Sequence, residues 1–358
     1  MEKSQLITVL RSTNQRERRQ IGLWLRSPAH NLRQDVVHLF DWLLENGHLD
    51  QMAVEKEAAW SAVFPKEHYD DARMRQTMYF LLKNIEEFLI WEELTKDDVR
   101  KISALSSVYR RRQLEKPFRQ SLENARRSAS ASPLRNAVHL QNAFNLELEE
   151  YKYLTTLKGH TRFNLQELSD SLDAAFVAQK LRIASLMLTH GAVYKAEYDT
   201  GLLEDVLRFV ETHKLLEKPA VATYFYCLKT ILEKTDEANY EQFEQCILQF
   251  SGHFPPTEQR ELFLFALNFC VARTNAGREP FIRKAFEIYK RGFEQKILLE
   301  DGLISGKTFV NAVQIALKLR EFLWIETFIE EYQVFVEEKQ RAALATTICI
   351  KFARMRRP

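Results

Sequence analysis

Glycine and proline are scarce in this chain, which has only 10 and 9 of them among 358 residues. Both residue types mark turns and interrupt helices, so their scarcity argues against a fold of many short elements. No segment shows the sustained apolar–polar alternation, bounded by turn residues, that is typical of a half-buried strand. Leu, Glu, Lys, Arg, Ala and Gln dominate and favour helix. The sequence therefore predicts an all-α protein, with roughly three quarters of its residues helical.

Motifs for catalysis and metal binding are also missing. The nine histidines are scattered, forming neither H-x-x-x-H nor H-E-x-x-H, and no G-x-S-x-G motif is present. The paired carboxylates Asp70–Asp71 and Asp97–Asp98 each begin an amphipathic helix, where they stabilise its free N–H groups. We therefore expect no metal site, no cofactor and no enzymatic activity.

The four cysteines form no C-x-x-C pair and lie among apolar residues in helical patterns. They are Cys227, Cys246, Cys270 and Cys349. This pattern predicts buried free thiols in a reducing compartment.

Long hydrophobic runs are absent as well. The most apolar stretch, from Leu262 to Ala272, is too short to span a bilayer, and the run from Leu6 to Leu10 is too short for a signal peptide. The net charge of +2 supports no binding of the whole protein to nucleic acid or membrane. We expect a cytoplasmic protein that has no membrane partner.

Helix periodicity and capping residues are what the sequence does contain. Four positions predict helix starts: Asn31 with Gln34 in capping-box spacing, Asp70, Ser132 followed by Pro133, and Asn164. Gly47 is expected to end the first of these helices, and the helix after Asn164 is expected to run towards Gly191.

The C-terminal part of the chain has the most regular pattern. Helices are predicted near 219–234, 238–251, 257–275, 280–297, 306–319, 322–337 and 338–355. Helix pairs recur at roughly 37–48 residues, within the range of helical-repeat proteins. We therefore expect an α-solenoid of stacked antiparallel helix pairs, a tetratricopeptide-like superhelix. Its regions would be 1–96, an N-terminal helical region, 97–160, long basic helices, and 161–358, the repeats, in one continuous solenoid.

Two motifs have both a structural and a functional interpretation. Gly302 to Thr308 resembles a phosphate-binding loop, but it has three residues between its glycines instead of four and no preceding strand. We expect a helix–helix loop in which Ser305 or Thr308 caps the next helix. Trp324, Phe328, Tyr332 and Phe335 recur at helical spacing, which predicts core packing over a ligand site.

A basic segment between Val99 and Asn136 is the most unusual feature, with ten Lys/Arg and only two acidic residues. Apolar positions run through it in two stripes that are out of phase, and Pro117 predicts a kink or break between them. Either the cations form a solvated helix face, or they form a surface for nucleic acid or an acidic protein. The candidate binding residues are Arg100, Lys101, Arg110, Arg111, Arg112, Lys116, Arg119, Arg126 and Arg127.

Several stretches resemble a family of uncharacterised bacterial helical-repeat proteins with a tetratricopeptide-like fold. They include Trp24–Pro28, Phe64–Pro65, Lys180–Arg182, Asn268–Cys270 and, most closely, Phe309–Tyr332. The resemblance covers nearly all of residues 1 to 336. It implies a tetratricopeptide-like superhelix and a chain truncated at its C-terminus, because family members continue with further helices.

These observations favour a non-catalytic scaffold that binds a protein or peptide partner on its helical-repeat surface. The alternative is a nucleic-acid-binding or regulatory protein that uses the basic segment, although no helix-turn-helix or RNA-binding signature supports it. Residues 342–352 are rich in apolar side chains, so we also expect association through the C-terminal helix.

Overall fold

The computed structural model of the chain describes residues 1–45, 49, 54–233 and 236–336. The protein is all-helical, at 77% helix, with 16 α-helices and no strand in the part that is described. This confirms the predicted all-α class, whereas the solenoid of stacked helix pairs stays a prediction. The chain forms two compact units, Met1–Val108 and Tyr109–Pro358. The three regions expected from the sequence stay a prediction.

The first unit is a small helical bundle. Its helices are α1 (Gln5–Ser12), α2 (Gln15–Arg26), α3 (Gln34–Leu44), α4 (Lys56–Val63), α5 (Asp71–Lys96) and most of α6 (Asp98–Arg111). Asp70 caps α5 as predicted, because its carboxylate accepts hydrogen bonds from the N–H groups of Ala72 and Arg73. Large side chains such as Phe40 and Phe88 fill the core and are almost fully buried.

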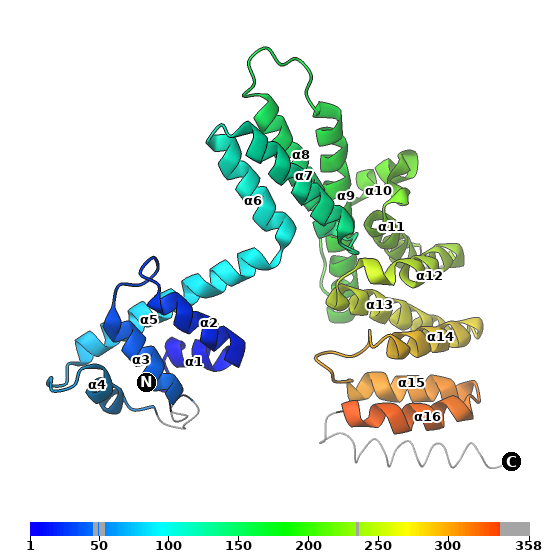
Figure 1. Cartoon of the computed structure of the whole chain (residues 1–358). Helices are drawn as coiled ribbons and strands as arrows, with labels where there is room; N and C mark the ends of the chain where they lie inside the picture. Colours follow the sequence, from blue (N-terminus) through cyan, green and yellow to red (C-terminus); the bar gives the residue numbers. More distant parts are fainter. Residues whose placement is uncertain (46–48, 50–53, 234–235, 337–358) are drawn as a thin grey trace. The chain divides into compact units, whose positions relative to one another are not determined.

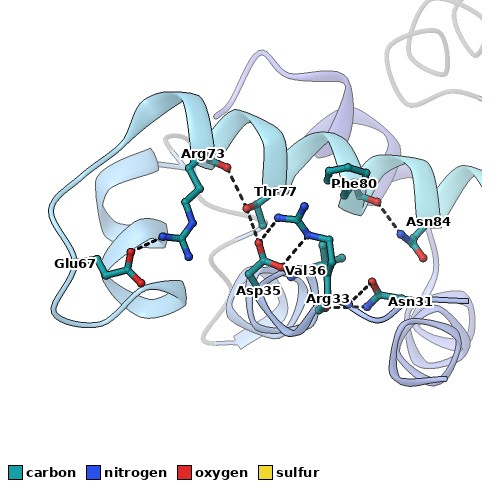
Figure 2. A network of polar contacts seen from close by, with 9 residues as sticks. All are labelled: Asn31, Arg33, Asp35, Val36, Glu67, Arg73, Thr77, Phe80 and Asn84. Atoms are coloured by element: carbon teal, nitrogen blue, oxygen red, sulfur yellow. Dashed lines mark hydrogen bonds and ion pairs between the residues drawn. The ribbon is translucent and has the colours of Figure 1, made fainter. Parts of the chain in front are cut away.

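A polar network fixes α3 against α5 in this unit (Figure 2). The Arg33 guanidinium donates two hydrogen bonds to Asp35, and the Thr77 hydroxyl donates a third at 2.9 Å. Burial pushes the pKa of Asp35 upward, but these hydrogen bonds outweigh it, so the pKa lies below its usual value. The Arg33 guanidinium also lies over the Phe80 ring, 4.4 Å from its centroid. The Thr77 hydrogen bond and the Arg33–Phe80 contact thus link the start of α3 to α5.

The same network shows that Asn31 does not cap a helix. Helix α3 begins at Gln34, and its N-cap residue is Arg33, which makes no capping side-chain hydrogen bond. The Asn31 side chain instead accepts a hydrogen bond from the Arg33 N–H and donates to the carbonyl oxygens of Leu25 and Arg33 (Figure 2). The predicted helix start at Asn31 is wrong, because an Asx turn occupies that position. Gly47 lies outside the described residues.

The second unit holds the remaining helices, which succeed one another in chain order from α11 to α16 (Figure 1). They are α7 (Glu115–Ala131), α8 (Ala137–Leu154), α9 (Leu165–Tyr194), α10 (Leu203–Thr212), α11 (Pro219–Leu232), α12 (Glu237–Phe250), α13 (Pro256–Asn275), α14 (Pro280–Glu294), α15 (Gly306–Lys318) and α16 (Phe322–Tyr332). Consecutive helices from α11 to α16 pack against each other, and α9 packs against α8, α10 and α11. Six of the seven predicted C-terminal helices are thereby confirmed, and 338–355 lies outside the described residues.

Two helix ends differ from their predicted positions. Ser132 follows the last residue of α7 instead of starting α8, and the N-cap of α8 is Asn136, whose side chain accepts from the His139 N–H. Helix α9 continues past Gly191 and ends at Tyr194, where Lys195 takes a left-handed conformation. The predicted start at Ser132 was wrong, and α9 ends three residues beyond Gly191.

Other local predictions are confirmed. Ser305 caps α15 by accepting from the Thr308 N–H, so the glycine-containing loop is a helix–helix connection. Phe328 and Tyr332 are buried in the core of the second unit, and Trp324 packs against it. The break near Pro117 falls just before α7, whose first turn contains that proline. Cys227, Cys246 and Cys270 are buried free thiols, whereas Cys349 lies outside the described residues.

Candidate partner-binding site

The predicted basic residues are divided between the two units, and most of them pair with carboxylates. Arg100 and Lys101 belong to the first compact unit, and the other seven belong to the second. Four of the nine pair with acids on their own helix or its cap: Arg100 with Asp97, Lys101 with Asp98, Arg119 with Glu115, and Arg127 with Glu123. Exposed pairs of this kind stabilise a helix only slightly, but each offsets a positive charge locally.

Two further cations are neutralised by α8. Arg110 donates to Glu149 at 3.0 Å, and both side chains are mostly buried, with exposed fractions of 19% and 10%. Arg126 pairs with Glu147, at 2.8 Å, and with Glu150. These acids lie outside the basic segment, so the segment's charge is balanced in three dimensions by a helix that follows it.

Three cations remain exposed where α6 ends and α7 begins. We name Arg111, Arg112 and Lys116 the turn cations. They are exposed and make no ion pair among the residues that the structure describes. Three charges on one turn are a much smaller footprint than the nine-residue surface considered from the sequence.

A groove among three helices of the second unit combines charged, polar and apolar side chains. One wall is α9, with Arg182, Leu186 and Thr189, and the other is α13, with Glu261, Phe265 and Asn268. Residues three, four and seven positions apart share one face of a helix, so each wall is one helix face. Tyr224 and Cys227 of α11 also line the groove, which has a volume of about 230 Å³.

A buried carboxylate underlies the groove. Glu258, in the first turn of α13, is only 2% exposed and accepts hydrogen bonds from the Tyr224 hydroxyl, at 2.5 Å, and from the Asn136 side-chain amide, at 3.1 Å. The Arg182 Nε atom lies 3.8 Å from the same carboxylate. Burial, followed by the Glu258 charge, raises the pKa of Tyr224, so its hydroxyl stays a donor. The four residues come from α9, α11, α13 and the cap of α8, and they fix the groove's floor.

Cys227 lines the groove, but its thiol is held in the protonated form. Burial raises the pKa of the Cys227 thiol to about 12, which disfavours the thiolate that a nucleophilic cysteine requires. Within the described residues, no group of three or more His, Cys, Asp or Glu side chains could hold a metal ion. No helix in that same part of the chain has the length and apolar character needed to cross a membrane.

Sequence reasoning missed this groove. Arg182 and Asn268 belong to two of the stretches that carry the family resemblance, but nothing in their local pattern indicates that they face each other. The residues of the floor are separated by up to 122 positions along the chain. The only signal in the sequence is that the groove residues of α9 and of α13 each share one face of a helix.

Comparison of the chain with protein-family models, with curated proteins and with solved structures found no match.

Proposed function

We propose that the chain is a non-catalytic scaffold whose helices form a superhelical stack and whose α9–α11–α13 groove receives a protein or peptide partner. The observation that carries this proposal is the groove itself. Each of its two walls has an apolar side chain, Leu186 or Phe265, between polar ones, and Tyr224 beneath them is held by its hydrogen bond to Glu258. A groove of this form suits a segment of a partner chain that inserts apolar side chains.

The size of the groove supports a peptide over a free small molecule. Ligand pockets for small molecules are usually about 300–1,000 Å³ and enclose most of the ligand. The volume of about 230 Å³ found here is enough for one or two side chains of a longer partner. Arg182 and Glu261 would then fix the orientation of that partner through hydrogen bonds at the two walls.

The nucleic-acid alternative has less support. Six of the nine candidate cations are paired with carboxylates, and binding to phosphates would require those pairs to be replaced. Of the nine candidates, only the turn cations are exposed and make no ion pair among the described residues. Affinity for nucleic acid rises with the number of phosphates neutralised, so three cations give a weak contribution.

Affinity capture from a native lysate tests the proposal with a matched pair of variants. Glu261→Arg with Asn268→Arg changes two exposed rim residues seven positions apart on α13. Gln242→Arg with Gln249→Arg adds two cations at the same spacing on the exposed face of α12. We expect the wild type and the α12 variant to recover the same stoichiometric protein, with or without nuclease, and the rim variant to recover at least about tenfold less. Equal recovery by both variants, or recovery that nuclease abolishes, would contradict the proposal.

A further inference from the structure

Helix α9 exposes a row of apolar side chains that no element of the described chain covers. Leu165, Leu172, Phe176, Ile183 and Leu186 are 54%, 48%, 48%, 50% and 43% exposed. The opposite side of the helix, with Val177 and Leu181, is buried in the core against other helices. This row is therefore an outward face of α9, separate from its packing face.

The row has the spacing of a coiled-coil seam. We name its positions the α9 seam: Leu165, Ser169, Leu172, Phe176, Gln179, Ile183, Leu186 and His190. Successive positions differ by four and three in strict alternation, which is the repeat of 3.5 residues that two helices need to stay in contact along their length. Ordinary surface helices do not require such a repeat on the side that faces solvent.

The charges of α9 are segregated along its length. Glu167, Asp170 and Asp173 lie in its N-terminal half, and Lys180 and Arg182 lie in its C-terminal half. Asp173 and Lys180 flank the seam on the same side and make no ion pair among the described residues. A parallel copy of the helix would bring like charges together, whereas an antiparallel copy would bring opposite charges together.

The geometry points to a second copy of this chain as the occupant of the α9 seam, bound antiparallel about a two-fold axis. Leu172 of each copy then packs on Ile183 of the other, and Phe176 packs on Gln179. Asp173 of each copy lies beside Lys180 of the other. A two-fold axis makes every such contact twice, which is the usual symmetry of a homodimer.

The exposed area suits a dimer of modest strength. Each of the five apolar seam residues exposes about half of its side chain, roughly 100 Å², so one copy presents about 500 Å². Two copies bury about 1,000 Å², near the lower limit of specific interfaces. We expect a dissociation constant in the micromolar range. This contact shares Leu186 with the groove but otherwise uses a different row of α9 residues, and so goes beyond the proposed function.

Sedimentation velocity of the full chain, from about 1 to about 100 µM, tests the pairing and its register. Leu172→Lys and Ile183→Glu each place two charges against apolar residues in a homodimer, so each should weaken dimerisation at least about tenfold. An equimolar mixture of the two variants forms one Lys–Glu contact and one Leu–Ile contact, and should dimerise nearly as well as the wild type. Leu232→Lys, at a site of equal exposure (48%) on α11, is the matched control.

The outcomes separate the two proposals. Dimerisation of the wild type, of Leu232→Lys and of the groove-rim variant, with loss in each seam variant and recovery on mixing, supports the antiparallel dimer. A wild type that stays monomeric at about 100 µM overturns it, as do seam variants that dimerise normally or fail to recover on mixing. Far-UV circular dichroism of each variant verifies that the substituted chains are folded.

Discussion

Removal of the buried Glu258 carboxylate should loosen the second unit around the groove. Glu258→Ala leaves the Tyr224 hydroxyl and the Asn136 amide without their acceptor, and Arg182 without the nearest opposite charge. The space left by the side chain is enclosed, because the residue is 2% exposed. Neither the Tyr224 hydroxyl nor the Asn136 amide can recover the lost interaction without bringing water into the core.

The expected destabilisation follows from the interactions that Glu258→Ala removes. A buried donor left without a partner costs about 1–3 kcal/mol, and breaking one side of a buried charge pair costs about 3–5 kcal/mol. The Arg182 side chain is 29% exposed and can hydrate in part, so the lower end applies and we expect about 3 kcal/mol. Tyr224→Phe removes one donor but leaves the carboxylate with Asn136 and Arg182, so it should cost only about 1 kcal/mol.

Hydrogen–deuterium exchange of the full chain measures the loss of stability helix by helix. A single unfolding midpoint is poorly defined for a chain with two compact units, whereas exchange reports the opening free energy of each helix. About 3 kcal/mol corresponds to roughly 100-fold faster exchange for α11 and α13, and α3 in the first unit serves as the unchanged reference. Acceleration below about tenfold in Glu258→Ala, or an equal effect of Tyr224→Phe, would refute the reasoning.

Two further predictions concern thiols and surface charge. Burial raises the pKa of Cys227 and Cys270 to about 12 and of Cys246 to about 11, so in a Cys349→Ser background we expect no labelling of native protein by maleimide at about pH 7. The thiol pKa values are higher in the folded protein than in the unfolded chain, where they are about 8.5. The free energy of unfolding should therefore be unaffected by these thiols below about pH 8.5 and should fall as the pH rises towards 11–12. Urea unfolding at a series of pH values measures this decrease. Charge reversal of all three turn cations to Glu should leave weak binding to random oligonucleotides unchanged in fluorescence anisotropy at about 150 mM salt. Tight binding that this reversal removes would favour the nucleic-acid alternative instead.

Helix starts were predictable where the signal acts within one turn. Asp70, Pro219, Pro256, Pro280 and Ser305 lie at the starts of α5, α11, α13, α14 and α15 because a capping side chain or a proline ring affects only neighbouring backbone groups. The two wrong starts had competing uses for the same atoms. The Ser132 hydroxyl accepts from the Leu134 N–H two residues on, as Asn31 does with Arg33, and so forms a turn in place of a cap.

Contacts between distant residues explain what the sequence could not show. The pairs of Arg119 with Glu115 and of Arg127 with Glu123 follow from a spacing of four, but Glu149 reaches Arg110 across 39 positions. The basic segment is therefore cationic along the sequence and largely balanced in the fold. The groove floor also depends on a contact between distant residues, because Asn136 reaches Glu258 only when α8 and α13 have packed into one unit.

Helix α9 shows why amphipathicity alone gave no indication of a binding surface. A helix with one apolar face has a clear polar side, and such a pattern identifies the core face directly. In α9, Val177 and Leu181 serve the core while Phe176 and Ile183 face outward, so apolar residues occur on opposite sides and the periodic signal cancels. The same cancellation is expected for a fully buried helix, and only the exposed fractions of the side chains in the structure distinguish the two cases. Asp173 and Lys180 lie beside the outward row. Burial of this row within its own unit would take both charges out of water without a partner, whereas an antiparallel copy of α9 would pair them.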